Sequence, residues 1–142
     1  MTSSRFARRL AGAAAAALVI GAGALATAPS AAAKANLLEI GKVALHEPGL
    51  QADVTYSCDP GMNHQLVANA VKPGTTGHDQ SVAAGTIKVD KLTCDYESHA
   101  ARVTLRPATG SHFAKGDQVK VTVFYFDDEG FSYAHQESVT RL

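Results

Sequence analysis

The sequence predicts an all-β fold: an antiparallel β-sandwich of immunoglobulin-like architecture, with seven to eight strands and one disulfide. Three observations support this prediction. After position 33, stretches of alternating apolar and polar residues are separated by turn-forming residues about every 8–13 positions. About 109 residues remain there, which suits one sandwich domain. The two cysteines in that part can staple the two sheets together. A small barrel is the alternative arrangement.

The first 33 residues have a different composition from the rest of the chain. Their charged residues are three arginines, at positions 5, 8 and 9, and an uncharged, alanine-rich stretch follows that ends in small residues. This order is typical of a secretory signal peptide. A permanent membrane anchor is the alternative, but alanine is only weakly hydrophobic and no basic stop-transfer cluster follows. We therefore expect residues 1–33 to be a signal peptide, cleaved after Ala33 or Ala35, and residues 34–142 to be a secreted, extracellular domain.

The charge balance differs between these two parts. The whole chain has 13 basic and 13 acidic residues, but three of the bases and none of the acids lie in the first 33 residues. Ten bases therefore face 13 acids in residues 34–142, a net charge of −3. A mildly acidic domain lacks the basic surface of a nucleic-acid binder or of a polybasic membrane reader. We expect no nucleic-acid partner and no stable membrane anchor after processing.

Both cysteines, Cys58 and Cys94, lie in the predicted secreted part. In an oxidising compartment an even pair is typical of a disulfide. The alternative is a metal or redox pair, which usually has C-x-x-C spacing or nearby histidines. Neither cysteine has such neighbours, so we predict one disulfide that closes a loop of about 36 residues.

The first half of the domain is divided by three Pro-Gly pairs, each a turn signal. We expect strands at 38–45, with Gly41 shifting the alternation, at 52–58 and at 66–71, followed by a loop at 75–80. The next strand is expected at 86–89, where a change of parity near Asp90 and Lys91 suggests a bulge before Leu92 and Cys94. The last strands are expected at 101–105, 119–126 and 131–139.

The last two strands form the most informative segment, a hairpin with the acidic tip 127–130. Pairing Phe126 with Phe131 would place Phe124 opposite Tyr133, Thr122 opposite His135 and Lys120 opposite Glu137. The apolar core side would then hold Val119, Val121, Val123 and Tyr125. The other side would hold a candidate binding surface made of Phe124, Phe126, Phe131, Tyr133 and His135. Alternatively, a strand or loop covers these rings, or they only stabilise the hairpin.

Motifs for metal binding and catalysis are missing from the sequence. The six histidines show neither H-x-H nor H-E-x-x-H spacing, and we expect them to be exposed residues in loops. The acidic tip lacks the D-x-D-x-D-G pattern of a calcium loop, so a solvated turn is expected. There is no G-x-S-x-G elbow, Walker sequence or G-x-G-x-x-G loop. We therefore expect no metal, no cofactor and no enzymatic activity.

The chain resembles small secreted two-cysteine proteins of high-GC Gram-positive bacteria. The resemblance spans about residues 50–140 and rests on the alanine-rich leader, VTYSC at 54–58, LTCD at 92–95 with His99 after it, and Gly116 ahead of a valine-rich strand. It implies an immunoglobulin-like sandwich outside the cell that is stapled by a disulfide, and it implies no catalytic residues.

Two functions are consistent with these observations. The first is a non-catalytic binding module for an unknown extracellular protein or cell-envelope component, using the hairpin aromatics or the loops near 60–61 and 75–80. The second is a small inhibitor of a secreted hydrolase, which would present the segment 59–62 beside the predicted disulfide.

Overall fold

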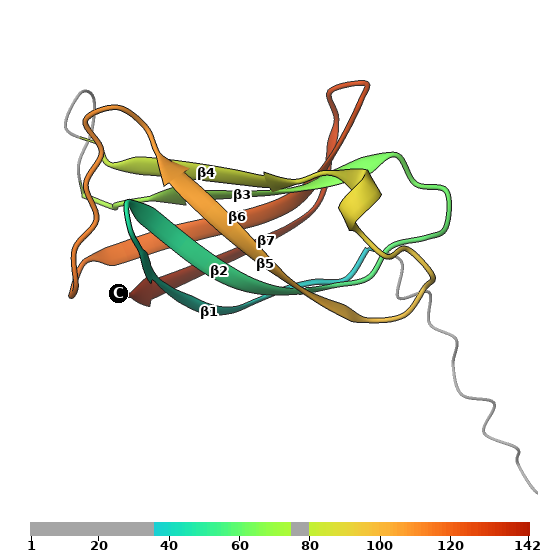
Figure 1. The fold of residues 1–142 in the computed structure, drawn as a ribbon, viewed down its shortest axis with the longest axis horizontal. Coiled ribbons are helices and arrows are strands. Elements are labelled where there is room, and N and C mark those ends of the chain that lie inside the picture. Colours follow the sequence, from blue (N-terminus) through green and yellow to red (C-terminus); the bar gives the residue numbers. More distant parts are fainter. Residues whose placement is uncertain (1–35, 75–79) are drawn as a thin grey trace, which may run out of the picture. The chain divides into compact units, whose positions relative to one another are not determined.

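The computed structural model describes residues 36–74 and 80–142. The predicted signal peptide and nearly all of the predicted loop at 75–80 lie outside these residues. The described residues form seven strands and one short 3-10 helix (Figure 1). In chain order these are β1 (Leu38–His46), β2 (Gly49–Tyr56), β3 (His64–Val71), β4 (Val82–Ile87), η2 (Val89–Lys91), β5 (His99–Pro107), β6 (Gln118–Asp127) and β7 (Ser132–Arg141).

The strands are hydrogen-bonded in the order β1-β2-β5-β4-β3-β6-β7, and every paired neighbour is antiparallel. Two long ladders, β1-β2-β5 and β4-β3-β6-β7, are joined only where Ala83 pairs with Pro107 and Ala84 pairs with Arg106. At the other side, the outer strands β1 and β7 lie against each other. The all-β, antiparallel class is confirmed, with a sheet that is nearly closed into a barrel.

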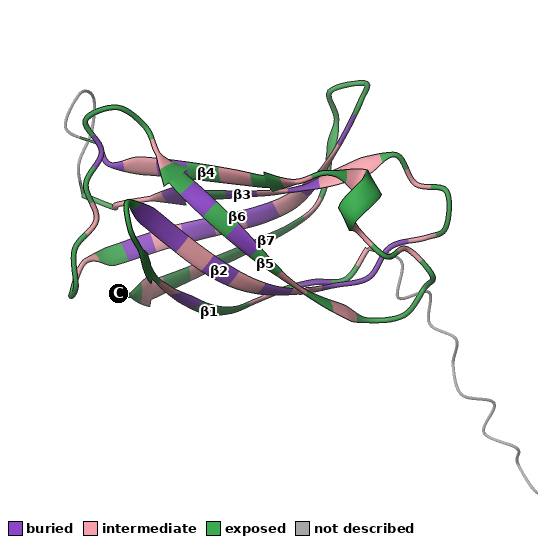
Figure 2. Cartoon of the chain, in the orientation of Figure 1, coloured by how far each residue is buried: buried purple, intermediate pink, exposed green. Residues whose placement is uncertain are grey.

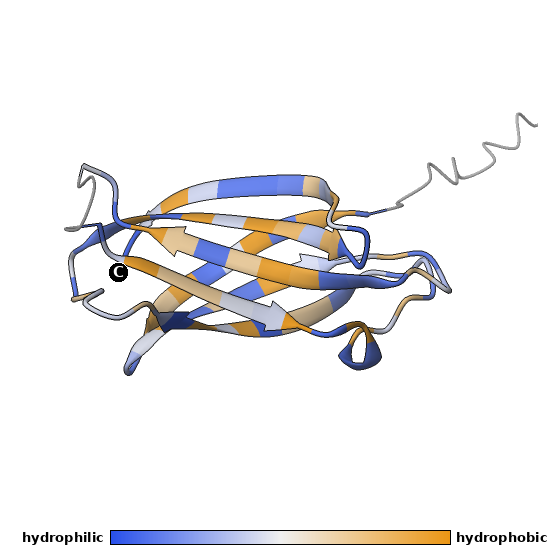
Figure 3. Ribbon diagram, turned by 90° about the horizontal axis from the view of Figure 1, so that it is seen from above, coloured by the Kyte–Doolittle hydropathy of each residue, from blue (hydrophilic) through white to orange (hydrophobic). Residues whose placement is uncertain are grey.

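The strand alternation decides which side chains form the core. Along β6, buried residues alternate with partly exposed ones, as Figure 2 shows, because successive side chains of a strand point to opposite faces. The predicted core side of this strand is confirmed: Val119, Val121, Val123 and Tyr125 are fully buried. They pack in one cluster with Leu50, Ala52, Val54, Leu66, Ala68, Val103 and Leu105. Figure 3 shows the apolar bands along the strands.

A glycine allows the two ladders to approach at their junction. A Cβ placed on Gly85 of β4 would lie 2.2 Å from the carbonyl oxygen of Thr104 in β5. No side chain fits at that distance, so the approach of β4 to β5 requires glycine. Gly49 of β2 allows a similar approach on the other side of β5, where a Cβ would lie 2.1 Å from the carbonyl oxygen of Leu105.

Several local predictions can be compared with the structure. The irregularity expected at Gly41 is confirmed, because the register of β1 with β2 shifts between Ile40 and Val43. The strand expected at 86–89 lies earlier, as β4 at Val82–Ile87, and the bulge expected before Leu92 and Cys94 is wrong: η2 occupies 89–91, and Cys94 lies in a loop. The backbone N–H of Thr93 donates to Tyr56 Oη at 3.0 Å, and this bond and the disulfide attach the segment to the end of β2.

Candidate binding surface

The β6–β7 turn is built around the carboxylate of Asp127. The backbone N–H of Asp127 donates to the Phe131 carbonyl at 3.0 Å, so these two residues close the hairpin. The Asp127 side chain accepts two further bonds, from the Phe131 N–H at 2.7 Å and from Tyr133 Oη at 2.8 Å. Gly130 has a φ of +94°, the left-handed conformation that glycine adopts without strain.

The predicted register of this hairpin is wrong. Phe126 faces Ser132 rather than Phe131, because Asp127 and Phe131 already form the closing pair. A second shift follows where Ala134 adopts a φ of +50°, so that Val123 pairs with Gln136. Beyond this irregularity Thr122 faces Glu137, not His135, and Lys120 faces Val139, not Glu137. The predicted contact between Lys120 and Glu137 is nevertheless made, as an ion pair with a 3.3 Å nitrogen–oxygen distance.

The register change divides the predicted aromatic cluster between two faces of the sheet. Phe124 and Phe126 remain on the face opposite the core, and His135 stacks on Phe124 with ring centroids 5.2 Å apart. Tyr133 pairs with Tyr125, so it lies on the same face as the core residues of β6. Phe131 lies before the first residue of β7 and is 59% exposed. Three of the five predicted side chains therefore share a face.

Tyr133 joins a polar cluster at the end of the core. His64 of β3 lies between two tyrosines, with ring centroids 5.0 Å from Tyr133 and 6.3 Å from Tyr125. The hydroxyl of Tyr125 donates to the Ser57 carbonyl at 2.9 Å, and burial raises the pKa of this hydroxyl. The hydrogen bond to Asp127 raises the pKa of Tyr133. Desolvation alone would raise the pKa of Asp127, but its hydrogen bonds from Phe131, Tyr133 and the turn backbone outweigh that effect and lower it.

On the opposite face, β3 and β6 form an apolar surface that is only partly covered. Val67 pairs with Phe124, and Gln65 pairs with Phe126, and all four side chains are partly exposed. We call these four residues the outer face of β3 and β6. β6 therefore has apolar side chains on both faces, one set fully buried and the other set reaching solvent.

A hollow of about 430 Å³ lies at the end of this outer face. Its lining comes from three places: the start of β3 and the residue before it, η2 and the residue before it, and the end of β6 with the turn that follows. Figure 1 shows η2 beside one end of β3 and β6. We call it the Phe126 hollow, after its aromatic residue. Its lining residues are Asn63, Gln65, Lys88, Val89, Asp90, Phe126 and Asp128.

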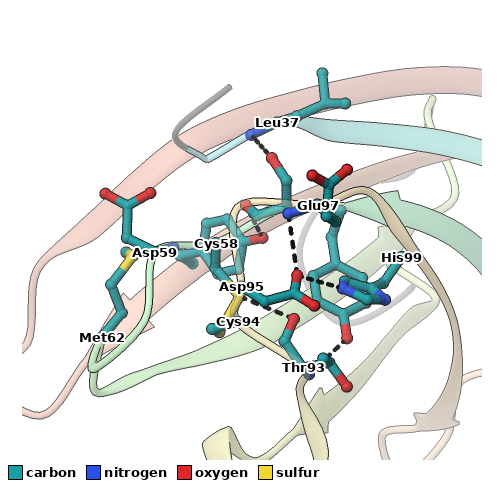
Figure 4. Close-up of a disulfide and its surroundings, with 12 residues drawn as sticks. Leu37, Cys58, Asp59, Met62, Thr93, Cys94, Asp95, Glu97 and His99 are labelled. Carbon is teal, nitrogen blue, oxygen red and sulfur yellow. Dashed lines mark hydrogen bonds and ion pairs between the residues drawn. A yellow bond between two sulfur atoms is a disulfide. The ribbon is translucent and has the colours of Figure 1, made fainter. Parts of the chain in front are cut away.

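The disulfide confirms the predicted pairing of Cys58 with Cys94 (Figure 4). Cys58 is buried in the core, and it links the end of β2 to the loop between η2 and β5. The backbone N–H of Tyr96 donates to the Cys58 carbonyl at 3.1 Å, beside the Thr93–Tyr56 bond already described. One covalent bond and two hydrogen bonds thus fix this loop on the core.

Within the same loop, Asp95 organises its neighbours through one oxygen (Figure 4). Asp95 Oδ1 lies 2.7 Å from His99 Nε2 and accepts the Glu97 N–H at 3.0 Å. These two bonds, the His99 bond first, lower the pKa of Asp95. The His99 ring in turn lies 5.7 Å from that of Tyr56. The arrangement explains the local fold of this loop without a ligand.

The expected position of the histidines needs correction. Among the described histidines only His112 lies in a loop, and the other four lie in strands. His46, His112 and His135 are exposed, but His64 and His99 are partly buried against aromatic rings, and His78 lies outside the described residues. Within 36–74 and 80–142, no three His, Cys, Asp or Glu side chains gather closely enough to hold a metal ion. The described part of the chain also contains no helix long and apolar enough to cross a membrane.

Most residues that line the Phe126 hollow were not among the predicted site residues. Phe126 was predicted from its parity, but Asn63, Gln65, Lys88, Asp90 and Asp128 were not. Pairing of β3 with β6 brings residues more than 60 positions apart together, and no local pattern encodes that pairing. Two sequence signals fall in this region: the acidic tip 127–130, which contains Asp128, and the change of parity at Asp90, which marks η2 rather than a bulge.

Comparison of the chain with protein-family models, curated proteins and solved structures gives no match.

Proposed function

We propose that the protein is a secreted, non-catalytic binding module of the immunoglobulin-like sandwich class. In this proposal it contacts an extracellular protein or cell-envelope component through the outer face of β3 and β6. The observation that carries the proposal is the position of Phe124 and Phe126. They lie opposite a fully buried core face, partly exposed, and Phe126 adjoins a hollow lined by polar groups. Aromatic side chains with accessible faces supply much of the energy of recognition sites.

Two further features support the cellular location and the architecture. A disulfide between Cys58 and Cys94 fits an oxidising compartment, and residues 1–33 have the composition of a signal peptide. The consecutive strands β2 and β3 belong to different ladders, as in the Greek-key connections of immunoglobulin-like sandwiches. The near closure of the sheet is the feature that departs from an open sandwich.

Capture from envelope and supernatant fractions of the producing organism tests this function. The double variant Phe124→Ser/Phe126→Ser should lose capture of the partner by about tenfold or more, because truncating central aromatic contacts costs most of the binding energy. Phe131→Ser is the matched control, since Phe131 lies on the same hairpin, is 59% exposed and does not line the hollow. It should bind like the wild type. Undiminished capture by a folded double variant would contradict the proposal.

A second candidate function is inhibition of a secreted hydrolase, favoured by the turn that follows Cys58. The Met62 N–H donates to the Asp59 carbonyl at 3.2 Å, and the Asp59 N–H lies 3.2 Å from Met62 Sδ. Pro60 and Gly61 at its tip are exposed. A rigid loop of this kind loses little entropy on binding. This function predicts stoichiometric inhibition of a secreted hydrolase, and a panel of secreted proteases that is unaffected by excess protein would count against it.

A further inference from the structure

The chemical groups around the Phe126 hollow narrow the kind of ligand that it can take. Its volume of about 430 Å³ is in the range of small-molecule sites, about 300–1,000 Å³. Three separate segments supply the lining, and each contributes a polar side chain: Gln65 from β3, Asp90 from η2 and Asp128 from the β6–β7 turn. Polar groups therefore surround the one aromatic ring on several sides.

The orientation of the polar groups is partly fixed by contacts within the protein. Asn63 Nδ2 donates to Asp128 Oδ2 at 2.7 Å, which ties the segment before β3 to the hairpin turn. Gln65 of β3 lies directly opposite Phe126 of β6, so their side chains start from neighbouring positions on one face. The strand pairing fixes these two backbone positions before any ligand arrives, which lowers the entropic cost of binding.

The hydrogen-bonding capacity of the hollow is mixed. Gln65 both donates and accepts, Lys88 only donates, and the carboxylates of Asp90 and Asp128 only accept. A hydroxyl group is the ligand counterpart of such a set, because it donates one hydrogen bond and accepts two. Phe126 and Val89 offer the apolar contact that the carbon skeleton of a ring can cover.

Formal charges are balanced at the hollow. The carboxylates of Asp90 and Asp128 are offset by Lys88 and by Lys91, whose Nζ lies 3.9 Å from Asp90 Oδ2. Such a balanced, solvent-exposed set gives no net attraction to an anion or to a cation. The lining favours a ligand that is neutral, rich in hydroxyl groups and flat enough to lie on a ring.

We propose that the Phe126 hollow binds a neutral carbohydrate, with a sugar ring on the face of Phe126 and its hydroxyl groups bonded to Gln65, Asp90 and Asp128. This inference rests on the proposed binding function and adds its ligand class. Phe124 and Val67 extend the apolar surface along β3 and β6 away from the hollow. The geometry therefore suits an oligosaccharide better than a single sugar.

The test uses the purified, disulfide-bonded protein on an array that contains neutral oligosaccharides of bacterial, fungal and plant type, anionic glycans and cationic peptides. We expect retention of a neutral oligosaccharide. Phe126→Ala and Gln65→Ala should each weaken it by about tenfold or more. Phe131→Ala is the matched control and should leave it unchanged. Isothermal titration with the retained oligosaccharide then gives the affinity of each variant.

The outcomes separate the ligand class from the proposed function. If no neutral glycan is retained, or if its retention does not depend on Phe126 and Gln65, the carbohydrate assignment is wrong. If capture from envelope or supernatant still depends on Phe124 and Phe126 in that case, the binding function stands with another ligand. If the array and the capture experiment both fail, the proposed function fails with the assignment.

Discussion

The two faces of the paired strands β3 and β6 differ in how far their apolar side chains are buried. On the inner face, Leu66, Val121, Val123 and Tyr125 are fully buried. On the outer face, Val67, Phe124 and Phe126 are apolar as well but remain partly exposed. A strand that needed only to form a half-buried sheet would alternate apolar with polar residues. Val67, Phe124 and Phe126 depart from this alternation, whereas Gln65, Thr122 and Lys120 on the same face follow it.

The two faces should therefore respond differently to substitution. Burial on the inner face gives a stabilisation that any similar side chain could supply, whereas the outer aromatics lie outside the buried core. Variants on the inner face should change the free energy of unfolding, and variants on the outer face should change binding.

The disulfide belongs to the buried side of the comparison, since Cys58 packs in the core. The double variant Cys58→Ser/Cys94→Ser should lower the free energy of unfolding by about 3–4 kcal/mol, because the bond closes a loop of 36 residues in the unfolded chain. Urea unfolding of the oxidised protein and the double variant measures the difference. A loss below about 1 kcal/mol would mean that the loop is held by its hydrogen bonds instead.

Leu66 and Val67 are neighbours on β3 that point to opposite faces, and they form a matched pair. Leu66→Ala should cost about 3 kcal/mol, because it opens a cavity in the closed core. Val67→Ala should cost about 1 kcal/mol or less, since that side chain already reaches solvent. Both values come from urea unfolding at a single pH. Equal losses would show that the outer face is also core.

Tyr125 and Tyr133 pair across the hairpin but differ in burial. Tyr125→Phe should cost about 1–2 kcal/mol, because it removes the buried bond from the hydroxyl to the Ser57 carbonyl. Tyr133→Phe should cost less, because Tyr133 is 41% exposed and water can replace its hydroxyl as a donor to Asp127. Thermal unfolding of the two variants compares them, and the reverse order would contradict the claim that burial of the Tyr125 hydroxyl makes its hydrogen bond the more important one.

The smallest effect concerns pH. Because hydrogen bonds lower the pKa of Asp127 in the folded state, its stabilisation is present above the unfolded pKa of about 4 and is lost as pH falls through the folded value. Unfolding free energies between pH 7 and pH 2 should therefore fall less steeply in Asp127→Asn than in the wild type. Glu129→Gln serves as the control, since it removes a charge from the same turn but leaves both carboxylate oxygens of Asp127 in place as acceptors. Identical slopes for all three proteins would refute the role of Asp127.

Part of this picture could be predicted from the sequence. The alternation in β2 and β6, the shift at Gly41 and the disulfide follow from local patterns or from cysteine number, and the structure confirms them. The hairpin register could not be predicted, because Asp127 closes the turn one residue beyond the expected pair and Ala134 adopts a left-handed conformation. The Phe126 hollow depends on pairing between β3 and β6, which is a non-local property.

The most direct test of the division between the faces compares Phe126→Ser with Leu66→Ala in two assays, urea unfolding and retention on envelope material. We predict that Phe126→Ser loses retention by about tenfold or more while its free energy of unfolding changes by less than about 2 kcal/mol. Leu66→Ala should show the opposite profile, with retention kept by the folded fraction. A folded Phe126→Ser protein that is retained like the wild type would contradict the central claim.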